Sequence, residues 1–190
     1  MHLAIILYFA LAFPLAVSAD IKAGEKKAQL CLLCHKLANA NAPRAIIPLL
    51  EAQPSRYLYL QTKAYKEKRR SDAIMQTNSA ILSDRDMRDI ADYLAAQKPL
   101  RATYGLDAPK VAGGGAKAEE LKCATCHLPS FAGKGEIPRL AGQVPGYLHR
   151  QMEAFQAGTR AHGTGRNAAP PLKLTEEEAE GLAQFLASLE

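Results

Sequence analysis

The pattern of apolar and polar positions opens with one long hydrophobic run. Residues 3–17 are almost entirely apolar, and Val17-Ser18-Ala19 ends the run with small residues before Asp20. This pattern is typical of a secretory signal peptide, so we predict cleavage after Ala19 and a mature chain outside the cytoplasm. The run lacks Lys and Arg, which leaves an uncleaved N-terminal anchor open, although so short a run would span a bilayer poorly.

Two later segments show the apolar spacing of an amphipathic helix. Each begins with a capping pattern, because Ser83 is followed three residues later by Asp86, and Thr175 by Glu178. Behind these caps, apolar residues recur at helical spacing and predict one buried stripe in each helix, formed by Met87, Ile90, Ala91 and Leu94 in the first and by Ala179, Leu182, Ala183 and Leu186 in the second.

The chain also repeats itself at a spacing of about ninety residues. The matched positions are Ile47-Pro48 with Ile137-Pro138, Gln53 with Gln143, Tyr57-Leu58 with Tyr147-Leu148, Gln61 with Gln151, Tyr65 with Phe155, and Arg70 with Arg160. Each copy is predicted to contain a leading helix, an irregular loop, a helix opened by Pro54 or Pro145, a second loop and the closing helix. No segment alternates as a strand would, so the predicted fold is all-α.

Breaker residues divide the chain into two small domains. Lys98-Pro99 stops the first copy, and Gly113-Gly114-Gly115 precedes the second. We therefore predict a signal peptide over residues 1–19, a first domain over 20–97, a linker over 98–115 and a second domain over 116–190. Each domain has only about 75 residues, too few for a generous hydrophobic core of its own.

The cysteines supply the chemistry. All four lie in two C-x-x-C-H motifs, made of Cys31, Cys34 and His35 in the first domain and of Cys123, Cys126 and His127 in the second. In the attachment motif of c-type haem, two thiols add to the vinyl groups of one porphyrin and the adjacent His ligates the iron. The motifs favour two covalently bound haem c groups over disulfides, a zinc site or a thioredoxin-like centre. Each haem would form much of its domain's core.

Beyond these motifs, the segment Pro138-Arg139-Leu140-Ala141-Gly142-Gln143, a Tyr-led helix, an Arg-bearing loop and a capped final helix resemble the dihaem cytochrome c4 family. The resemblance covers nearly the whole mature chain and is looser at residues 48–53. It implies a tandem pair of class I cytochrome c domains in the periplasm. It also implies that the carbonyl oxygens of Pro48 and Pro138 accept from the ring N–H groups of His35 and His127.

The sixth ligand of each iron decides whether that iron is six-coordinate, or closed, or has a free site for small ligands. Met/His coordination raises the reduction potential and favours electron transfer. In the first domain Met75 stands in the second loop, where the family places its ligand; the alternative is a Met that fills a gap in the core. Met87 falls on the apolar stripe.

The second domain has no Met at the corresponding position. Counting from the arginines places Gly165 opposite Met75, and counting back from the closing helix places Asn167 there. His162 is the leading candidate in this loop, and an open, water-bound or Asn167-bound iron is the main alternative. Met152 lies on the buried side of a predicted helix and is expected to fill the core, and His149 is expected at the surface. Met152, Lys173 or another group remains a lesser candidate for the ligand.

Charge and composition exclude some functions. The chain carries a formal net charge of +5, which the four propionates of two haems would reduce to about +1, so nucleic-acid binding is not indicated. One cluster of basic residues is either a solvated helix face or a docking patch for an acidic redox partner or a membrane surface. Its members are Lys63, Lys66, Lys68, Arg69 and Arg70.

We expect a protein that is not an enzyme and has no small-molecule substrate. It would carry electrons between redox proteins, such as a dehydrogenase or quinol-oxidising complex and a terminal oxidase. The alternative is a haem enzyme or small-ligand-binding protein that uses an open sixth position on the second haem.

Overall fold

A computed structural model describes residues 20–36, 45–163 and 165–190 of the chain. The predicted signal peptide lies outside these residues. The described parts are helical and contain no strand; one isolated antiparallel bridge joins Lys134 and Ile137. None of the helices in these parts is both long and apolar enough to cross a membrane. The all-α prediction is confirmed.

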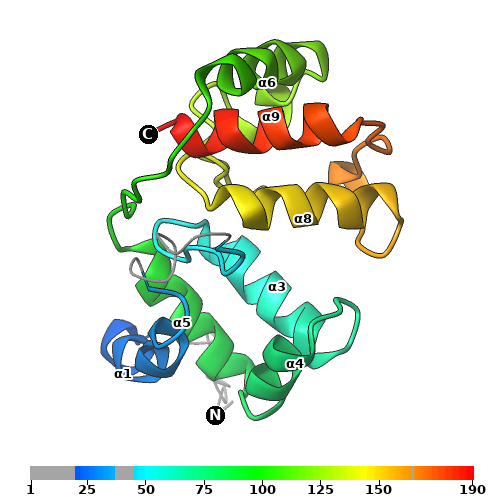
Figure 1. Cartoon of the computed structure of the whole chain (residues 1–190). Helices are drawn as coiled ribbons and strands as arrows, with labels where there is room; N and C mark the ends of the chain where they lie inside the picture. Colours follow the sequence, from blue (N-terminus) through cyan, green and yellow to red (C-terminus); the bar gives the residue numbers. More distant parts are fainter. Residues whose placement is uncertain (1–19, 37–44, 164) are drawn as a thin grey trace, which may run out of the picture.

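Figure 1 shows the helices in two groups, one below the other, with α3 and α8 facing each other where the groups meet. The lower group contains α1 (Ile21–Leu32), α3 (Ser55–Lys66), α4 (Ala73–Ala80) and α5 (Asp84–Ala95). The upper group contains α6 (Ala108–Glu120), α7 (Ala124–His127), α8 (Pro145–Gln156), a short 3-10 helix (Gly165–Asn167) and α9 (Glu176–Ser188).

The closing helices form as their sequences predict. In α5 the Ser83 side chain accepts from the backbone of Asp86 while the Asp86 side chain accepts from the backbone of Ser83, and Thr175 and Glu178 make the same reciprocal pair in α9. Both predicted apolar stripes are buried, with exposed fractions between 1% and 7%. Each stripe forms the centre of one hydrophobic core, so each group of helices is a unit with its own interior.

The leading and closing helices of each unit touch backbone to backbone. A Cβ atom added to Gly24 of α1 would lie 2.0 Å from the carbonyl oxygen of Asp89 in α5. A Cβ atom added to Gly114 of α6 would lie 2.0 Å from the carbonyl oxygen of Gly181 in α9. Only glycine permits so close an approach, and the crossing fixes the direction in which each leading helix delivers its cysteine motif.

Two segments differ from the sequence predictions. The second loop of the first copy contains a two-turn helix, α4, capped by the Asp72 side chain. The glycines at 113–115 lie inside α6, which starts at Ala108. Residues 108–115 of the predicted linker over 98–115 are therefore helical, and the domain limits themselves stay a prediction. Packing against α9 stabilises a helix that the glycines alone disfavour.

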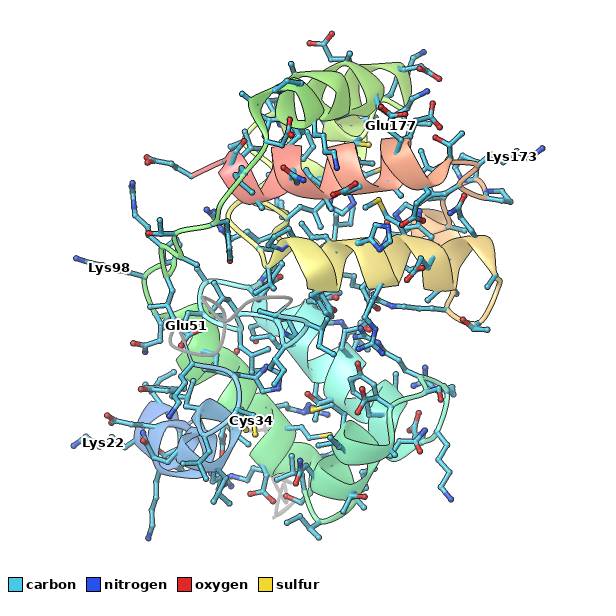
Figure 2. The ribbon with its side chains drawn as sticks, viewed as in Figure 1. Lys22, Cys34, Glu51, Lys98, Lys173 and Glu177 are labelled. Atoms are coloured by element: carbon cyan, nitrogen blue, oxygen red, sulfur yellow. The ribbon has the colours of Figure 1, made fainter. Side chains whose placement is uncertain are left out.

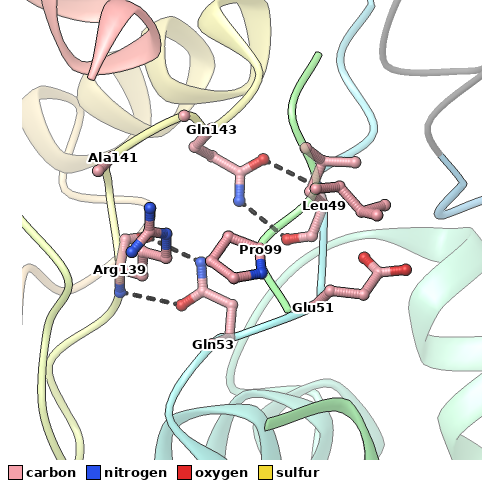
Figure 3. A pocket seen from close by; sticks show the side chains of 9 residues that line it. Leu49, Glu51, Gln53, Pro99, Arg139, Ala141 and Gln143 are labelled. Atoms are coloured by element: carbon pink, nitrogen blue, oxygen red, sulfur yellow. Dashed lines mark hydrogen bonds between the residues drawn. The ribbon is translucent and has the colours of Figure 1, made fainter. Parts of the chain in front are cut away.

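The two units meet through a reciprocal pair of side-chain amides (Figure 3). Gln53 accepts from the backbone N–H of Arg139 at 3.0 Å and donates to its carbonyl oxygen at 2.8 Å. Gln143 makes the same two contacts with Leu49, at 2.8 and 2.9 Å. Both glutamines are buried. The pairs relate the units by an approximate two-fold axis, so each copy holds the other in the same way.

A second reciprocal contact involves the two arginines that the repeat matches. Arg70 donates to the Tyr147 hydroxyl and to the Gln151 side chain, both at 2.9 Å. Arg160 reaches across in the opposite direction and donates to the Tyr57 hydroxyl at 3.1 Å. Because charge-assisted hydrogen bonds between partly buried groups are sensitive to geometry, these contacts restrict movement between the units.

The basic cluster of the first unit does not form one solvated patch. Arg70 is buried in the contact with the second unit. Lys63 pairs with Asp84 at 3.3 Å, and Arg69 pairs with Glu67 at 2.5 Å. These partners offset much of the positive charge locally and weaken the interpretation of the cluster as a docking surface.

Candidate haem sites

The first motif continues directly from α1. Backbone N–H groups of Cys34 and His35 both donate to the carbonyl oxygen of Cys31, at 3.1 and 3.0 Å, so the chain turns tightly around the two thiols. His35 is buried, and its Nδ1 lies 2.8 Å from the carbonyl oxygen of Pro48. This is the contact predicted for Pro48, and it is confirmed. Burial lowers the pKa of His35, which keeps the imidazole neutral, as metal ligation requires.

The second motif lies in α7 and repeats this geometry. His127 is buried, and its Nδ1 lies 2.9 Å from the carbonyl oxygen of Pro138, again as predicted. Burial lowers the pKa of His127 as well. Leu128 ends the helix with a φ of +68°. Gly133, with a φ of +67°, has no room for a Cβ atom because the carbonyl carbon of Pro138 would lie 2.3 Å away, so it fixes the loop that presents this carbonyl group.

The donor set fits a covalently attached haem at each motif. In both copies Nδ1 of the histidine is engaged by a proline carbonyl group, which leaves Nε2 for an iron. The first cysteine of each motif, Cys31 or Cys123, is half-buried, and the second, Cys34 or Cys126, is exposed. Burial raises the pKa values of the Cys31 and Cys123 thiols. Two thiols followed by a histidine whose Nδ1 is engaged match the attachment motif of c-type haem.

In the first unit, α4 carries the candidate sixth ligand. The Asp72 side chain accepts from the backbone N–H of Met75 at 2.9 Å and so caps the helix. Burial is the main influence on the pKa of His35 and lowers it, whereas the charge of Asp72 acts on this pKa in the opposite direction. Met75 is half-buried one turn into the same helix. Its role as a ligand stays a prediction.

In the second unit, His162 lies beside the motif. Its ring centre is 6.4 Å from that of His127, with an angle of 25° between the ring planes. On another side it stacks on Phe155, at 4.5 Å and 19°. The Arg160 guanidinium lies over the same phenyl ring at 4.8 Å. Burial lowers the pKa of His162, so this imidazole is also neutral.

The other candidates of the second unit lie elsewhere. Met152 is 6% exposed and packs in the core cluster, in line with its expected role. The Asn167 side chain donates to Glu136 at 3.4 Å. Lys173 is exposed, and its side chain points away from the molecule (Figure 2). His149 lies against acidic side chains of α8 and α9 rather than against the motif.

The sequence analysis did not assign any residue to a contact between the units. The sequence nevertheless contains a sign of this contact, because the repeat matches polar residues, which the apolar core of a domain does not require. These pairs are Gln53 with Gln143, Tyr57 with Tyr147, Gln61 with Gln151, and Arg70 with Arg160. Polar identity retained between two copies indicates a contact between the copies.

Comparison with known proteins gives consistent matches. The family model described as "Cytochrome c" matches residues 112–190. The chain is 31% identical to cytochrome c4 of Pseudomonas aeruginosa over 184 residues, which cover 90% of each protein. It is 29% identical to the thiosulfate dehydrogenase electron acceptor of Thiomonas intermedia, over 91% of this chain and 84% of that protein.

The fold is similar to that of a solved structure as well. Reduced recombinant cytochrome c4 from Pseudomonas stutzeri superposes with a TM-score of 0.75 and 28% identity, covering 91% of this chain and 100% of that one. The match extends over both units and therefore includes their mutual arrangement as well as each fold.

Proposed function

Because this chain belongs to the cytochrome c4 family and is a dihaem electron-transfer cytochrome, we propose that it carries electrons between two redox proteins outside the cytoplasm. The donor would be a dehydrogenase or quinol-oxidising complex, and the acceptor a terminal oxidase. The observation that carries the proposal is the repeated site: in each unit a two-thiol motif is followed by a buried histidine with Nδ1 bonded to a proline carbonyl group. Each haem c supplies a one-electron couple at its iron.

In the first unit, Cys31 and Cys34 would hold the porphyrin through thioethers and His35 would ligate the iron. The bond to the Pro48 carbonyl group fixes the tautomer and the orientation of the imidazole. Met75 would complete the coordination from α4. A closed, six-coordinate iron needs little rearrangement when an electron arrives or leaves, which suits a carrier.

In the second unit, Cys123 and Cys126 would form the thioethers and His127 the proximal bond. We propose domain limits of 20–97 and 108–190, joined by residues 98–107, because α6 belongs to the second unit. The reciprocal contacts of Gln53 and Gln143 would keep the two sites at one separation during electron exchange.

The comparisons also support one particular type of donor. One relative is named thiosulfate dehydrogenase electron acceptor, and this chain covers 84% of it. A thiosulfate-oxidising dehydrogenase is therefore a second candidate partner. If it is a donor, thiosulfate will reduce the cytochrome in the presence of a catalytic amount of such a dehydrogenase and will not reduce it alone.

Export would proceed by cleavage after Ala19. The backbone nitrogen of Asp20 lies 3.1 Å from a carboxylate oxygen of Asp89, which is 2% exposed. A chain that starts at Asp20 would place its terminal ammonium group against this buried carboxylate, where an opposite charge is favourable. N-terminal sequencing of the periplasmic protein tests this: Asp20 as the first residue supports the proposal, and an intact residue 1 contradicts it.

The function itself is tested by counting haems and electrons. Mass spectrometry of the purified holoprotein should give the mature polypeptide plus two haems, with no thiol available to alkylating reagents. Coulometric titration should then take up two electrons per chain. The double variant Cys123→Ala/Cys126→Ala, a matched control, should retain one haem and one electron. A wild-type chain with a single haem or with disulfides would refute the dihaem carrier.

A further inference from the structure

The loop between α8 and α9 is the part of the second unit that departs most from the first. Asp72 caps α4 in the first unit, and the residue ninety positions further on is His162. His162 lies next to His127, the proximal histidine of its unit. By sequence position the two loops correspond, and where the first offers Met75 three residues after Asp72, the second offers His162 itself.

The separation of the two imidazoles matches a pair that shares one metal ion. With metal–nitrogen bonds of about 2 Å and a ring nitrogen about 1.2 Å from its ring centre, two histidines on opposite sides of an iron have ring centres about 6.4 Å apart. The centres of His127 and His162 are 6.4 Å apart. By contrast, His162 and Phe155 are in direct stacking contact at 4.5 Å. The additional distance toward His127 leaves room for one atom between the imidazoles.

The hydrogen bonds of His162 are consistent with a ligand. Its Nδ1 is buried and has no hydrogen-bond partner within the described residues. A buried polar atom without a partner costs about 1–3 kcal/mol, so proteins rarely keep one that has no role. Nδ1 of His127 is already bonded to Pro138, which leaves its other nitrogen available.

The backbone holds the His162 ring in place. The carbonyl oxygen of His162 accepts from the backbone N–H of Ala169 at 2.8 Å, which closes the loop. Gly163 has a φ of +81°, and a Cβ atom there would lie 1.8 Å from the carbonyl oxygen of Asn167. The turn after His162 therefore requires glycine. Phe155 covers one face of the imidazole, so the ring is fixed by packing as well as by the backbone.

We propose that His162 is the sixth ligand of the second haem, which is therefore bis-histidine coordinated while the first has histidine and methionine. This inference rests on the dihaem function proposed above. Replacing a thioether by an imidazole lowers the reduction potential, because imidazole stabilises the ferric iron. Electrons that enter through the second unit would then pass downhill to the first.

The decisive experiment compares three oxidised holoproteins by electron paramagnetic resonance and by carbon monoxide binding after reduction. The wild type should show two low-spin haems, only one of which has the long-wavelength charge-transfer band of methionine ligation. His162→Ala should convert one haem to high spin and bind carbon monoxide at that haem at least tenfold faster than the wild type. His149→Ala, which removes a histidine of the same unit away from the motif, should match the wild type.

Chemical rescue separates ligation from packing. Added imidazole should restore the low-spin spectrum of His162→Ala, which it would not do if the variant had merely lost the stacking on Phe155. If the His162→Ala haem stays low-spin, the ligand is another residue and the inference fails. If the wild-type second haem is high-spin, the site is open and the inference also fails. In both cases, a wild-type chain that holds two haems and takes up two electrons would still support the proposed dihaem carrier.

Discussion

Two adjacent glycines in α6 should respond in opposite ways to replacement by alanine. Gly114 touches the backbone of α9: an added Cβ atom would lie 2.0 Å from the carbonyl oxygen and 2.4 Å from the carbonyl carbon of Gly181. Gly113 points away, with no atom within 4 Å of such a Cβ atom. The two substitutions are chemically identical and one position apart in the same helix.

The magnitudes follow from this geometry. At Gly113, alanine should stabilise the second domain by about 0.5–1 kcal/mol, because it restricts the unfolded chain and favours the helix. At Gly114 the same gain is outweighed, since α6 and α9 must separate by more than an ångström. Overpacking of a rigid contact costs about 1–3 kcal/mol and sometimes more. For a domain of this size, 1 kcal/mol corresponds to about 4–8 °C in the melting temperature.

Thermal unfolding of the ferric holoprotein, followed by circular dichroism, measures the difference. We expect the second-domain transition of Gly113→Ala a few degrees above the wild type and that of Gly114→Ala at least about 5 °C below it. Equal or higher melting of Gly114→Ala would show that the helices do not cross at this residue. The reasoning from backbone contact would then be refuted.

Three further outcomes are expected. Replacing Met75 by alanine should lower the potential of the first haem in a redox titration, with each 59 mV lost equal to about a tenfold change in equilibrium; unchanged titration of both haems would make Met75 a packing residue. Ala52 has a φ of +57°, and Gly142 has a φ of +71° at the equivalent position of the second copy. A side chain is strained at such angles, so Ala52→Gly should raise the free energy of unfolding in urea by about 0.5–1 kcal/mol and Gly142→Ala should lower it by a similar amount. Changes of the opposite sign would contradict the strain. Burial opposes the ionisation of Asp89, but hydrogen bonds from a backbone N–H and from Lys27 lower its pKa below 3.8. The resulting stability is complete above about pH 4 and is lost as the pH falls through the lowered pKa. Lys27→Met should therefore flatten the fall in melting temperature between about pH 5 and about pH 3, and an unchanged slope would exclude this pair.

Much of the architecture is predictable because its signals are local. A capping box at Ser83 or Thr175 depends on residues three apart, and the buried stripe behind it on residues three and four apart. The cysteine motifs are equally local. The bonds from His35 to Pro48 and from His127 to Pro138 were predicted because a family resemblance supplied them, not because spacing did.

The features that escaped prediction depend on contacts between distant segments. A run of glycines predicts a linker on propensity alone, and only the backbone of α9 explains why Gly114 lies in a helix. Likewise, α4 lies in a segment that was predicted to be a loop. His162 was one of several candidates until the structure placed its ring 6.4 Å from that of His127. The choice among the candidate ligands depends on distance in space, which the spacing of residues along the chain does not give.

The most direct test of the central claim is quantitative electron paramagnetic resonance of the fully oxidised holoprotein. A dihaem carrier with both irons closed should give two distinct low-spin ferric signals, each integrating to one spin per chain, with no high-spin signal. Ferric signals that together integrate to only one spin per chain would contradict two haems. A high-spin signal of one spin per chain would contradict a six-coordinate second iron.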